Sequence, residues 1–446
     1  MKLQKVLFLC TFIFISLMMQ AQQSLNMTLL GNLDYSNELS DIWGYATPDG
    51  EYALVGVYNG ISVVDVTNTA NPNELGFFPG PGSIWRDLKT WGNYLYCINE
   101  SGGGLQIVNL AEVISGDPDP TYIENMSLGF TTAHNIYIDE NGVLYVFGSN
   151  YGVGGAAMYD LVANQEDPTF LGLFDDYYLH DGMVRGDTLW GGAIYNGVFS
   201  VVDVSDKANP QILASHSTPN TFSHNCWISD NGDYLFTTDE VSGAYVAAYD
   251  VSDLSDIEEL DRIQAWSPET TVIPHNTHVD GDFVVTSYYT DGVSVVDVSR
   301  PSNMIEVGYY DTSVNFSGDG FSGAWGAYPW LPSGNILVTD IETGLYIIKV
   351  DPLDTNLVPH YYPSNKLWSM ADTINLISDT LGLEIMLSPV VEPDTANLCY
   401  IYGFLQPDTN APSPLFNVSK AHFRGPVDIE DSLVIGLFSL DSNVYD

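Results

Sequence analysis

Basic residues are scarce in this chain. Lysine and arginine together number 12, against 57 aspartate and glutamate residues, which gives a formal net charge of -45. A surface this acidic repels phosphate backbones and anionic lipid headgroups. Nucleic acid and anionic membranes are therefore not expected partners, whereas divalent cations are compatible ones. The same charge also keeps an exported protein soluble.

Cysteines and long apolar runs are scarce too. The one extended apolar stretch follows two lysines and ends at Ala21, an arrangement typical of a secretory signal peptide over residues 1–21. Cleavage would leave Cys97, Cys226 and Cys399, whose spacing matches no zinc pattern and allows at most one disulfide. No later segment is apolar for long enough to cross a bilayer. We therefore expect an exported protein, either secreted or at the cell surface.

Common catalytic motifs are also absent. The chain contains neither a G-x-S-x-G nucleophile elbow nor a G-x-x-x-x-G-K-[ST] phosphate loop. The glycine-rich segments 101–105 and 151–155 precede strand patterns rather than helix patterns, so we interpret them as loops. Local motifs therefore assign no enzyme class.

A repeated block runs through most of the sequence. Its clearest copies are "NGISVVDVTNTANP" from Asn59, "NGVFSVVDVSDKANP" from Asn196 and "DGVSVVDVSRPSN" from Asp291. Each copy has a glycine, an alternating apolar strand, an Asp-Val-Thr/Ser segment and a polar turn. With four weaker copies, from Gly103, Gly155, Gly243 and Gly344, there are seven.

A bulky anchor residue lies upstream of every copy. The anchors are spaced 42, 49, 46, 44, 51 and 50 residues apart, and they are Trp43, Trp85, His134, His180, His224, His275 and Trp325. Four short antiparallel strands at this period predict the blades of a β-propeller.

The two ends of the repeat array predict how the ring closes. The seventh copy stops at Val350 without a fourth strand, while residues 26–33 form a strand pattern before the first anchor. Pairing the two would remove unpaired edges. We therefore expect an all-β, seven-bladed propeller over residues 26–350, closed by its N-terminal strand. Residues 352–446 carry alternating strands of a different texture, which predict a small β-rich, sandwich-like region.

The repeat core resembles the LVIVD repeat. This repeat occurs in exported bacterial propellers with a variable C-terminal attachment module, the choice-of-anchor B type of surface protein. The resemblance implies a secreted or cell-surface propeller and does not imply an enzyme. Copies two and seven depart from it with Asn109 and Lys349 at the aspartate position, and copy three has a Met-Tyr core.

Four of the anchors are histidines, which raises the question of a metal site. The first strands of all blades run the same way along a propeller channel, so His134, His180, His224 and His275 should lie near one mouth. Imidazole is a ligand for zinc and copper, and ligands from successive blades need no short spacing in sequence. The alternative interpretation is structural, with each histidine donating a hydrogen bond to a neighbouring carbonyl. Strand alternation predicts that His278 faces away from the four anchors.

Other residues accompany the histidines at the expected mouth. Trp43, Trp85, Arg86, Asp181 and Trp325 complete the candidate ligand-binding set. Asp181 follows its anchor directly and could support a ligand or act as a general base. Arg86 with Asp87, by contrast, could hold neighbouring blades together.

Two further groups of aspartates belong to turns. The aspartates that end the repeat strands are expected to accept backbone N–H groups in the following turn. Aspartates in the hairpin turns make calcium a further candidate, although none matches an EF-type loop.

Three functions remain open from the sequence. The first is an exported module whose channel mouth binds a small ligand or a surface protein or glycan. The second is a copper- or zinc-dependent oxidoreductase or hydrolase that uses the four histidines. The third is a structural spacer, which predicts a mouth without convergent polar groups.

Overall fold

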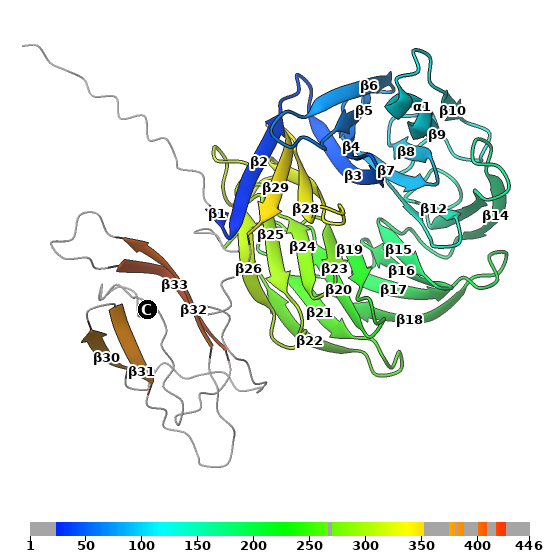
Figure 1. The fold of residues 1–446 in the computed structure, drawn as a ribbon. Coiled ribbons are helices and arrows are strands. Elements are labelled where there is room, and N and C mark those ends of the chain that lie inside the picture. Colours follow the sequence, from blue (N-terminus) through cyan, green and yellow to red (C-terminus); the bar gives the residue numbers. More distant parts are fainter. Residues whose placement is uncertain are drawn as a thin grey trace, which may run out of the picture. The chain divides into compact units, whose positions relative to one another are not determined.

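The structure is a computed structural model that describes residues 24–265 and 270–351, together with the backbone of four strands between 374 and 424. Within residues 24–351, seven antiparallel sheets surround a common axis (Figure 1). The predicted seven-bladed, all-β propeller is confirmed.

The first four blades follow the chain from the first anchor. Blade 1 comprises β3 (Leu39–Thr47), β4 (Gly50–Val57), β5 (Gly60–Asp65) and β6 (Asn73–Pro79). Blade 2 comprises β7 (Arg86–Trp91), β8 (Tyr94–Asn99), β9 (Leu105–Asn109) and β10 (Tyr122–Asn125), with the helix α1 (Leu110–Ser115) before β10. Blade 3 comprises β11 (Asn135–Ile138), β12 (Val143–Phe147), β13 (Ala156–Asp160) and β14 (Thr169–Phe174). Blade 4 comprises β15 (Gly182–Arg185), β16 (Thr188–Ala193), β17 (Val198–Asp203) and β18 (Gln211–Ser217).

The last three blades complete the ring. Blade 5 comprises β19 (Ser223–Ile228), β20 (Tyr234–Asp239), β21 (Val246–Asp250) and β22 (Glu258–Ile263). Blade 6 comprises β23 (Thr277–Asp280), β24 (Phe283–Ser287), β25 (Val293–Asp297) and β26 (Ile305–Tyr310), and β1 (Ser24–Leu25) pairs with β26. Blade 7 comprises β27 (Ala324–Tyr328), β28 (Asn335–Asp340), β29 (Gly344–Val350) and β2 (Met27–Leu33).

The N-terminal strand closes the ring as predicted. β2 is the outermost strand of blade 7 and pairs antiparallel with β29, from Met27 opposite Val350 to Leu33 opposite Leu345. The first strand of each blade contacts the first strands of both neighbouring blades, and β27 returns to β3. These seven strands therefore line the channel, and their side chains determine what its mouth can bind.

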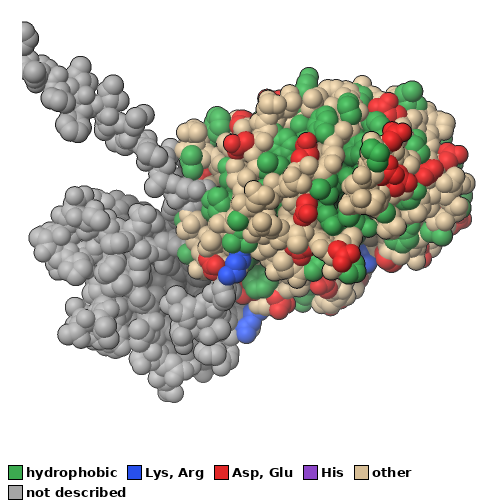
Figure 2. All heavy atoms as spheres, turned by 45° about the horizontal axis from the view of Figure 1, so that its top comes forward, with side chains coloured by type: hydrophobic (Ala, Val, Ile, Leu, Met, Phe, Trp, Pro, Cys, Tyr) green, Lys and Arg blue, Asp and Glu red, His purple; other side chains and the backbone are tan. Residues whose placement is uncertain are grey.

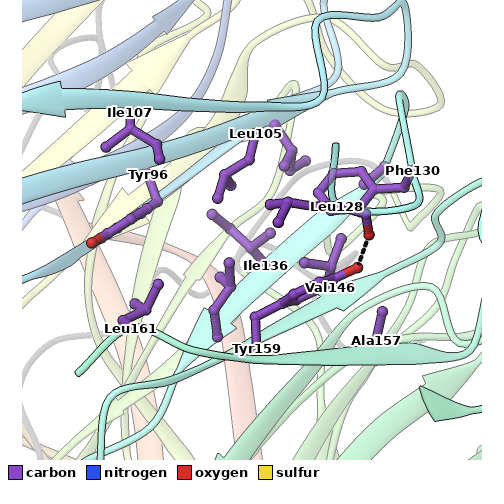
Figure 3. Close-up of a cluster of buried hydrophobic side chains, with 13 residues drawn as sticks. Tyr96, Leu105, Ile107, Leu128, Phe130, Ile136, Val146, Ala157, Tyr159 and Leu161 are labelled. Atoms are coloured by element: carbon purple, nitrogen blue, oxygen red, sulfur yellow. Dashed lines mark hydrogen bonds between the residues drawn. The ribbon is translucent and has the colours of Figure 1, made fainter. Parts of the chain in front are cut away.

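Apolar side chains fill the space between blades. Alternating apolar residues on the inner strands of one blade pack against those of the next blade. The cluster that joins blades 2 and 3 is an example (Figure 3). In that cluster the Tyr159 hydroxyl donates to the carbonyl of Leu128. This bond satisfies the only polar atom of the Tyr159 side chain. Each blade thus covers its neighbour, and the ring needs no separate core.

The repeated aspartates have the structural role that the sequence predicts. At the end of the third strand of four blades, an aspartate side chain accepts from the backbone N–H two residues later. The pairs are Asp65 with Thr67, Asp160 with Val162, Asp203 with Ser205 and Asp250 with Ser252. These side chains are committed to turns and are not part of the channel.

The chain beyond Asp351 belongs to a second unit, which is described by itself. Its described strands are two antiparallel pairs, β30 (Ile374–Asp379) with β31 (Gly382–Leu387) and β32 (Tyr400–Pro407) with β33 (Phe416–Arg424). The predicted sandwich over residues 352–446 and the signal peptide over residues 1–21 fall largely outside the described residues, so both stay predictions.

Candidate metal centre at the channel mouth

A β-bulge at the start of the channel strands decides which side chains enter the mouth. In blade 4, His180 N–H donates to the carbonyl of Gly192, and the N–H of the same glycine donates to the carbonyl of Asp181. Two residues therefore face one, which is the definition of a bulge, and both side chains turn to the channel. His275 and Asn276 repeat the pattern in blade 6. In these two blades the anchor thus brings its successor into the mouth.

The four predicted histidines lie together as an arc. The ring centroids of His134 and His180 are 3.7 Å apart, those of His180 and His224 are 4.3 Å apart, and those of His224 and His275 are 4.7 Å apart. The indole of Trp325 continues the arc at 4.6 Å from His275. Residues separated by more than 140 positions in sequence therefore share one rim of the channel.

Asp181 lies at the centre of this arc. Its Oδ1 is 3.0 Å from His180 Nδ1 and 3.7 Å from His134 Nε2, and its Oδ2 is 3.8 Å from His224 Nδ1. The side chain is 2% exposed. One buried carboxylate thus faces three imidazoles from blades 3, 4 and 5.

Two glutamates that the sequence analysis did not single out complete the cluster. Glu100 Oε1 is 2.6 Å from His134 Nδ1, and Glu240 lies with Oε2 3.4 Å from His224 Nε2 and Oε1 4.0 Å from His275 Nε2. Both glutamates directly follow the second strand of their blade, β8 or β20. An acidic residue at this position of the repeat was the signal that could have identified them.

Several polar atoms of the cluster are buried without a hydrogen-bond partner. They are Nδ1 of His180, Nδ1 of His224 and Oδ1 of Asp181. Although His180 and Asp181 lie within ion-pair distance, their geometry does not form a hydrogen bond. An unsatisfied buried polar group costs about 1–3 kcal/mol. Three such atoms lie in this one cluster, and a group bound between them would satisfy them.

Hydrogen bonds at Nδ1 fix two of the imidazoles. His134 Nδ1 faces the Glu100 carboxylate, and His275 Nδ1 donates to the carbonyl of Trp325. A proton on Nδ1 leaves a lone pair on Nε2, and in both residues Nε2 faces a carboxylate of the cluster. A histidine held in this way by a carboxylate or a carbonyl is the usual arrangement of a metal ligand.

The electrostatics of the cluster keep most imidazoles neutral. Burial and repulsion from neighbouring imidazoles lower the pKa of His180 and His224, and burial lowers that of His275 to about 4. Burial alone would lower the pKa of His134 too, but the hydrogen bond to Glu100 raises it above its usual value. Neutral imidazole is the form that binds a metal ion.

The carboxylates respond in opposite directions. Burial would raise the pKa of Asp181, but the surrounding imidazoles outweigh it and lower the pKa below the usual range. Burial raises the pKa of Glu240 to about 7. These shifts favour the anionic form of Asp181 and, relative to an ordinary glutamate, the protonated form of Glu240.

A pocket opens beside the cluster. It is small, with a cavity volume of about 20 Å³, and it is lined by Asp41, Trp85, Arg86, Asp87, His134, Asn135, Asp181, His275, Asn276 and Trp325. Most of these side chains are polar and come from the anchor position or the residue after it. A group held by His134 and Asp181 would border this pocket.

The predicted companions of the histidines fall into different places. Trp85, Arg86, Asp181 and Trp325 line the pocket, and Trp85 is 43% exposed. Arg86 is buried and donates to the carbonyls of Val57 and Pro81 and to Gln106. Its guanidinium therefore ties blade 2 to blade 1 and is not free for a ligand.

The position of Trp43 corrects the sequence analysis. The centre of its ring is 4.9 Å from the ring centre of Tyr328 and 5.5 Å from that of Trp330. Lys89 Nζ lies 4.4 Å from the centre of the Trp43 ring. A register shift in β3 between Leu39 and Ile42 gives the anchor position of blade 1 to Ser40. Trp43 is thus three residues further along its strand and does not line the mouth pocket.

His278 also differs from its expectation. It is buried, and the centre of its ring is 4.7 Å from that of Trp227 and 5.1 Å from that of Trp330. Trp330 also contacts Trp43, so the two residues lie in one aromatic group. The bulge adds one residue, so the side chain three beyond an anchor turns back to the channel. Trp43, Tyr137, Trp227, His278 and Tyr328 form a second layer, in which ring centroids of neighbours are 4.7–6.4 Å apart and Lys89 lies over the ring of Trp43.

Calcium sites in the hairpin turns find no support in Asp139. Its Oδ1 accepts from the N–H groups of Asn141 and Val143, and its Oδ2 accepts from Tyr145. Within residues 24–265 and 270–351, the groups of three or more close metal-ligating side chains lie at the histidine cluster.

The fold and its mouth define a seven-bladed β-propeller with a histidine-rich channel rim. The LVIVD repeat family matches residues 49–78, 193–218 and 276–312, which contain the three clearest copies of the repeat. The propeller therefore contains LVIVD repeats in blades 1, 4 and 6. No curated protein matches it. No helix in the described part of the chain is long and apolar enough to cross a membrane.

Proposed function

We propose that this propeller is an exported metal-binding module that holds a transition-metal ion, copper or zinc, through His134, His180, His224 and Asp181. The observation that carries the proposal is the convergence of one ligand atom from each of these four residues, all within 4.8 Å of one another. Ligand atoms bound to one tetrahedral ion at about 2.1 Å stand about 3.4 Å apart. The separations of 3.0, 3.7 and 3.8 Å around Asp181 are close to that value.

The chemistry of the donor set supports the same ion class. Three imidazoles and one carboxylate suit zinc and copper better than magnesium or calcium, which prefer oxygen ligands. The high negative charge of the chain concentrates cations near its surface. In Figure 2, acidic side chains are spread over the visible face of the propeller and basic ones are few.

The mouth favours a binding role over a spacer. A spacer requires no convergent polar groups, whereas here a pocket borders His134 and Asp181. A small ligand that enters the pocket could complete the coordination of a bound ion. Such an arrangement would allow the module to bind a small ligand. If that ligand is a substrate, the bound ion could assist its hydrolysis or oxidation.

Metal analysis of the purified full chain tests the proposal. After loading with zinc and gel filtration, the wild-type protein should retain at least one ion per chain. The variant His180→Gln should bind zinc more than about 100-fold more weakly, because losing a ligand exceeds the 10–100-fold effect of an outer partner. The matched control is His216→Gln, which removes an imidazole on β18 that bonds only to the carbonyl of Ser217. A folded wild-type protein that retains neither zinc nor copper would refute the proposal.

Export and surface display form the second part of the proposal. They rest on the signal-like residues 1–21 and on the resemblance to surface propellers of the choice-of-anchor B type. Mass spectrometry of the mature protein should find an N-terminus just after Ala21. An intact N-terminus in the cytoplasmic fraction would contradict export.

A further inference from the structure

A second group of metal-ligating side chains adjoins the proposed site. It consists of His224, Glu240 and His275, whose ligand atoms also lie within 4.8 Å of one another. His224 belongs to both groups. The arrangement raises the question of whether one imidazole serves two ions.

The two nitrogens of His224 face two different carboxylates. Nδ1 is 3.8 Å from Asp181 Oδ2, and Nε2 is 3.4 Å from Glu240 Oε2. The side chain is 2% exposed, and its Nδ1 has no hydrogen-bond partner. An imidazole that only filled structure would donate one proton to a nearby acceptor. Here each ring nitrogen faces a position that is already flanked by another histidine.

Hydrogen bonds also orient the side chains of the second group. His275 Nδ1 donates to the carbonyl of Trp325, so the lone pair of His275 Nε2 faces Glu240 Oε1 at 4.0 Å. The hydroxyl of Tyr289 donates to the same oxygen of Glu240. Ligating carboxylates are commonly hydrogen-bonded in this way from outside the site.

We propose that the mouth binds two divalent transition-metal ions and that His224 bridges them as an imidazolate. This inference rests on the proposed function, because the first ion occupies the site of His134, His180 and Asp181. The second ion is bound by His224 Nε2, Glu240 and His275 Nε2. Binding of the second ion releases to solvent the remaining N–H proton of His224 and any proton held by Glu240, and no electron is transferred.

The charges of the cluster favour this occupancy. Two divalent ions carry four positive charges, and Asp181, Glu240 and the imidazolate supply three negative ones. Glu100, which bonds to His134, supplies a fourth close by. The charges of the cluster then balance, with Glu100 39% exposed at its edge, and this balance lowers the cost of placing the other charges away from water.

Metal stoichiometry of the full chain separates the inference from the proposed function. Zinc titration followed by elemental analysis should give two ions per chain for the wild-type protein and for His216→Gln. The double variant Glu240→Gln/His275→Gln should retain one. One ion in the wild-type protein, unchanged by the double variant, would overturn the inference and leave the proposed function intact. Absence of bound zinc and copper from folded wild-type protein would overturn both.

Copper binding tests the bridge itself. Two copper(II) ions joined by an imidazolate couple magnetically, so the electron paramagnetic resonance signal at low temperature should rise to one equivalent and then fall as the second is added. In Glu240→Gln/His275→Gln the signal should rise to one equivalent and remain there. A wild-type signal that doubles at two equivalents would mean two isolated ions and would overturn the bridge. Circular dichroism of each variant confirms that the propeller is folded.

Discussion

Lys89 should be essential to the stability of the propeller because it neutralises two carboxylates inside the channel. Its Nζ lies 2.5 Å from Asp87 Oδ1 and 3.6 Å from Asp41 Oδ2, and the exposed fractions of Lys89 and Asp41 are 6% and 9%. Burial and the charge of Asp87 already raise the pKa of Asp41 well above its usual range. The substitution Lys89→Met keeps most of the side-chain volume and removes the only cation of this group.

The expected cost follows from leaving a buried charge without its partner. Removing one member of a buried ion pair typically costs about 3–5 kcal/mol. For a domain of about 325 residues the entropy of unfolding is about 0.7 kcal/mol/K, so Tm should fall by about 4–7 °C. The loss should also depend on pH. Without the ammonium the folded-state pKa of Asp41 lies further above its unfolded value, so stability is retained at low pH and is lost as pH rises through the folded pKa.

Thermal unfolding monitored by circular dichroism at about pH 5 and about pH 7 measures both effects. Lys89→Met should be most destabilised at the higher pH, and adding Asp41→Asn should recover part of the loss. Lys207→Met is the matched control, because Lys207 pairs 3.1 Å from an Asp187 side chain that is 59% exposed. Exposed pairs contribute about 0–1 kcal/mol, so this variant should change Tm by no more than about 1–2 °C. Equal losses in the two variants, or a loss in Lys89→Met that does not change with pH, would refute the argument.

Three other predictions concern the closure, the bulge and the metal. Removing residues 24–33 takes away β2 and exposes the edge of β29, so size-exclusion chromatography should show aggregates, whereas removing residues 24–25 alone should leave a monomer. Gly192→Ala would place a methyl group 2.3 Å from the carbonyl oxygen of His224 and should cost about 1–3 kcal/mol in thermal unfolding. In Gly320→Ala the nearest atom is 3.6 Å away, so stability should stay within about 0.5 kcal/mol of wild type. Zinc affinity should fall between about pH 8 and about pH 5, because His134, whose pKa is raised, must lose a proton to bind; a pH-independent affinity would exclude it as a ligand.

The sequence predicted the architecture well because its signals are periodic. Repeat copies at Asn59, Asn196 and Asp291 established the period, and an unpaired strand pattern at each end established the closure. Both features survive substitution at single positions, since they depend on the spacing and alternation of many residues. The same periodicity brought His134 and His180 to a common rim.

The side chains of the channel were harder to predict because they depend on one-residue shifts. The bulges at His180 and His275 are invisible in the sequence, yet they decide that Asp181 faces the mouth and that His278 returns to the channel. Trp43 resembled an anchor by its size, although the shift in β3 gives that position to Ser40. Glu100 and Glu240 directly follow second strands, so the signal for them is their position in the repeat and not their distance in sequence from the histidines.

The closure of blade 7 has a mechanical consequence. β29 is paired with β28 on one side and with β2 on the other, and the chain leaves the propeller immediately after it. Any pulling force transmitted through the residues beyond Asp351 therefore acts along a strand held by two ladders that must shear together. The outermost strand β2 adds a direct link at this point, because Asp351 N–H donates to the carbonyl of Asn26 and Thr28 donates to the Asp351 carboxylate. A tether attached after Asp351 would pull on a strand that is hydrogen-bonded on both sides. It would not pull on an edge strand, whose hydrogen bonds can break one at a time.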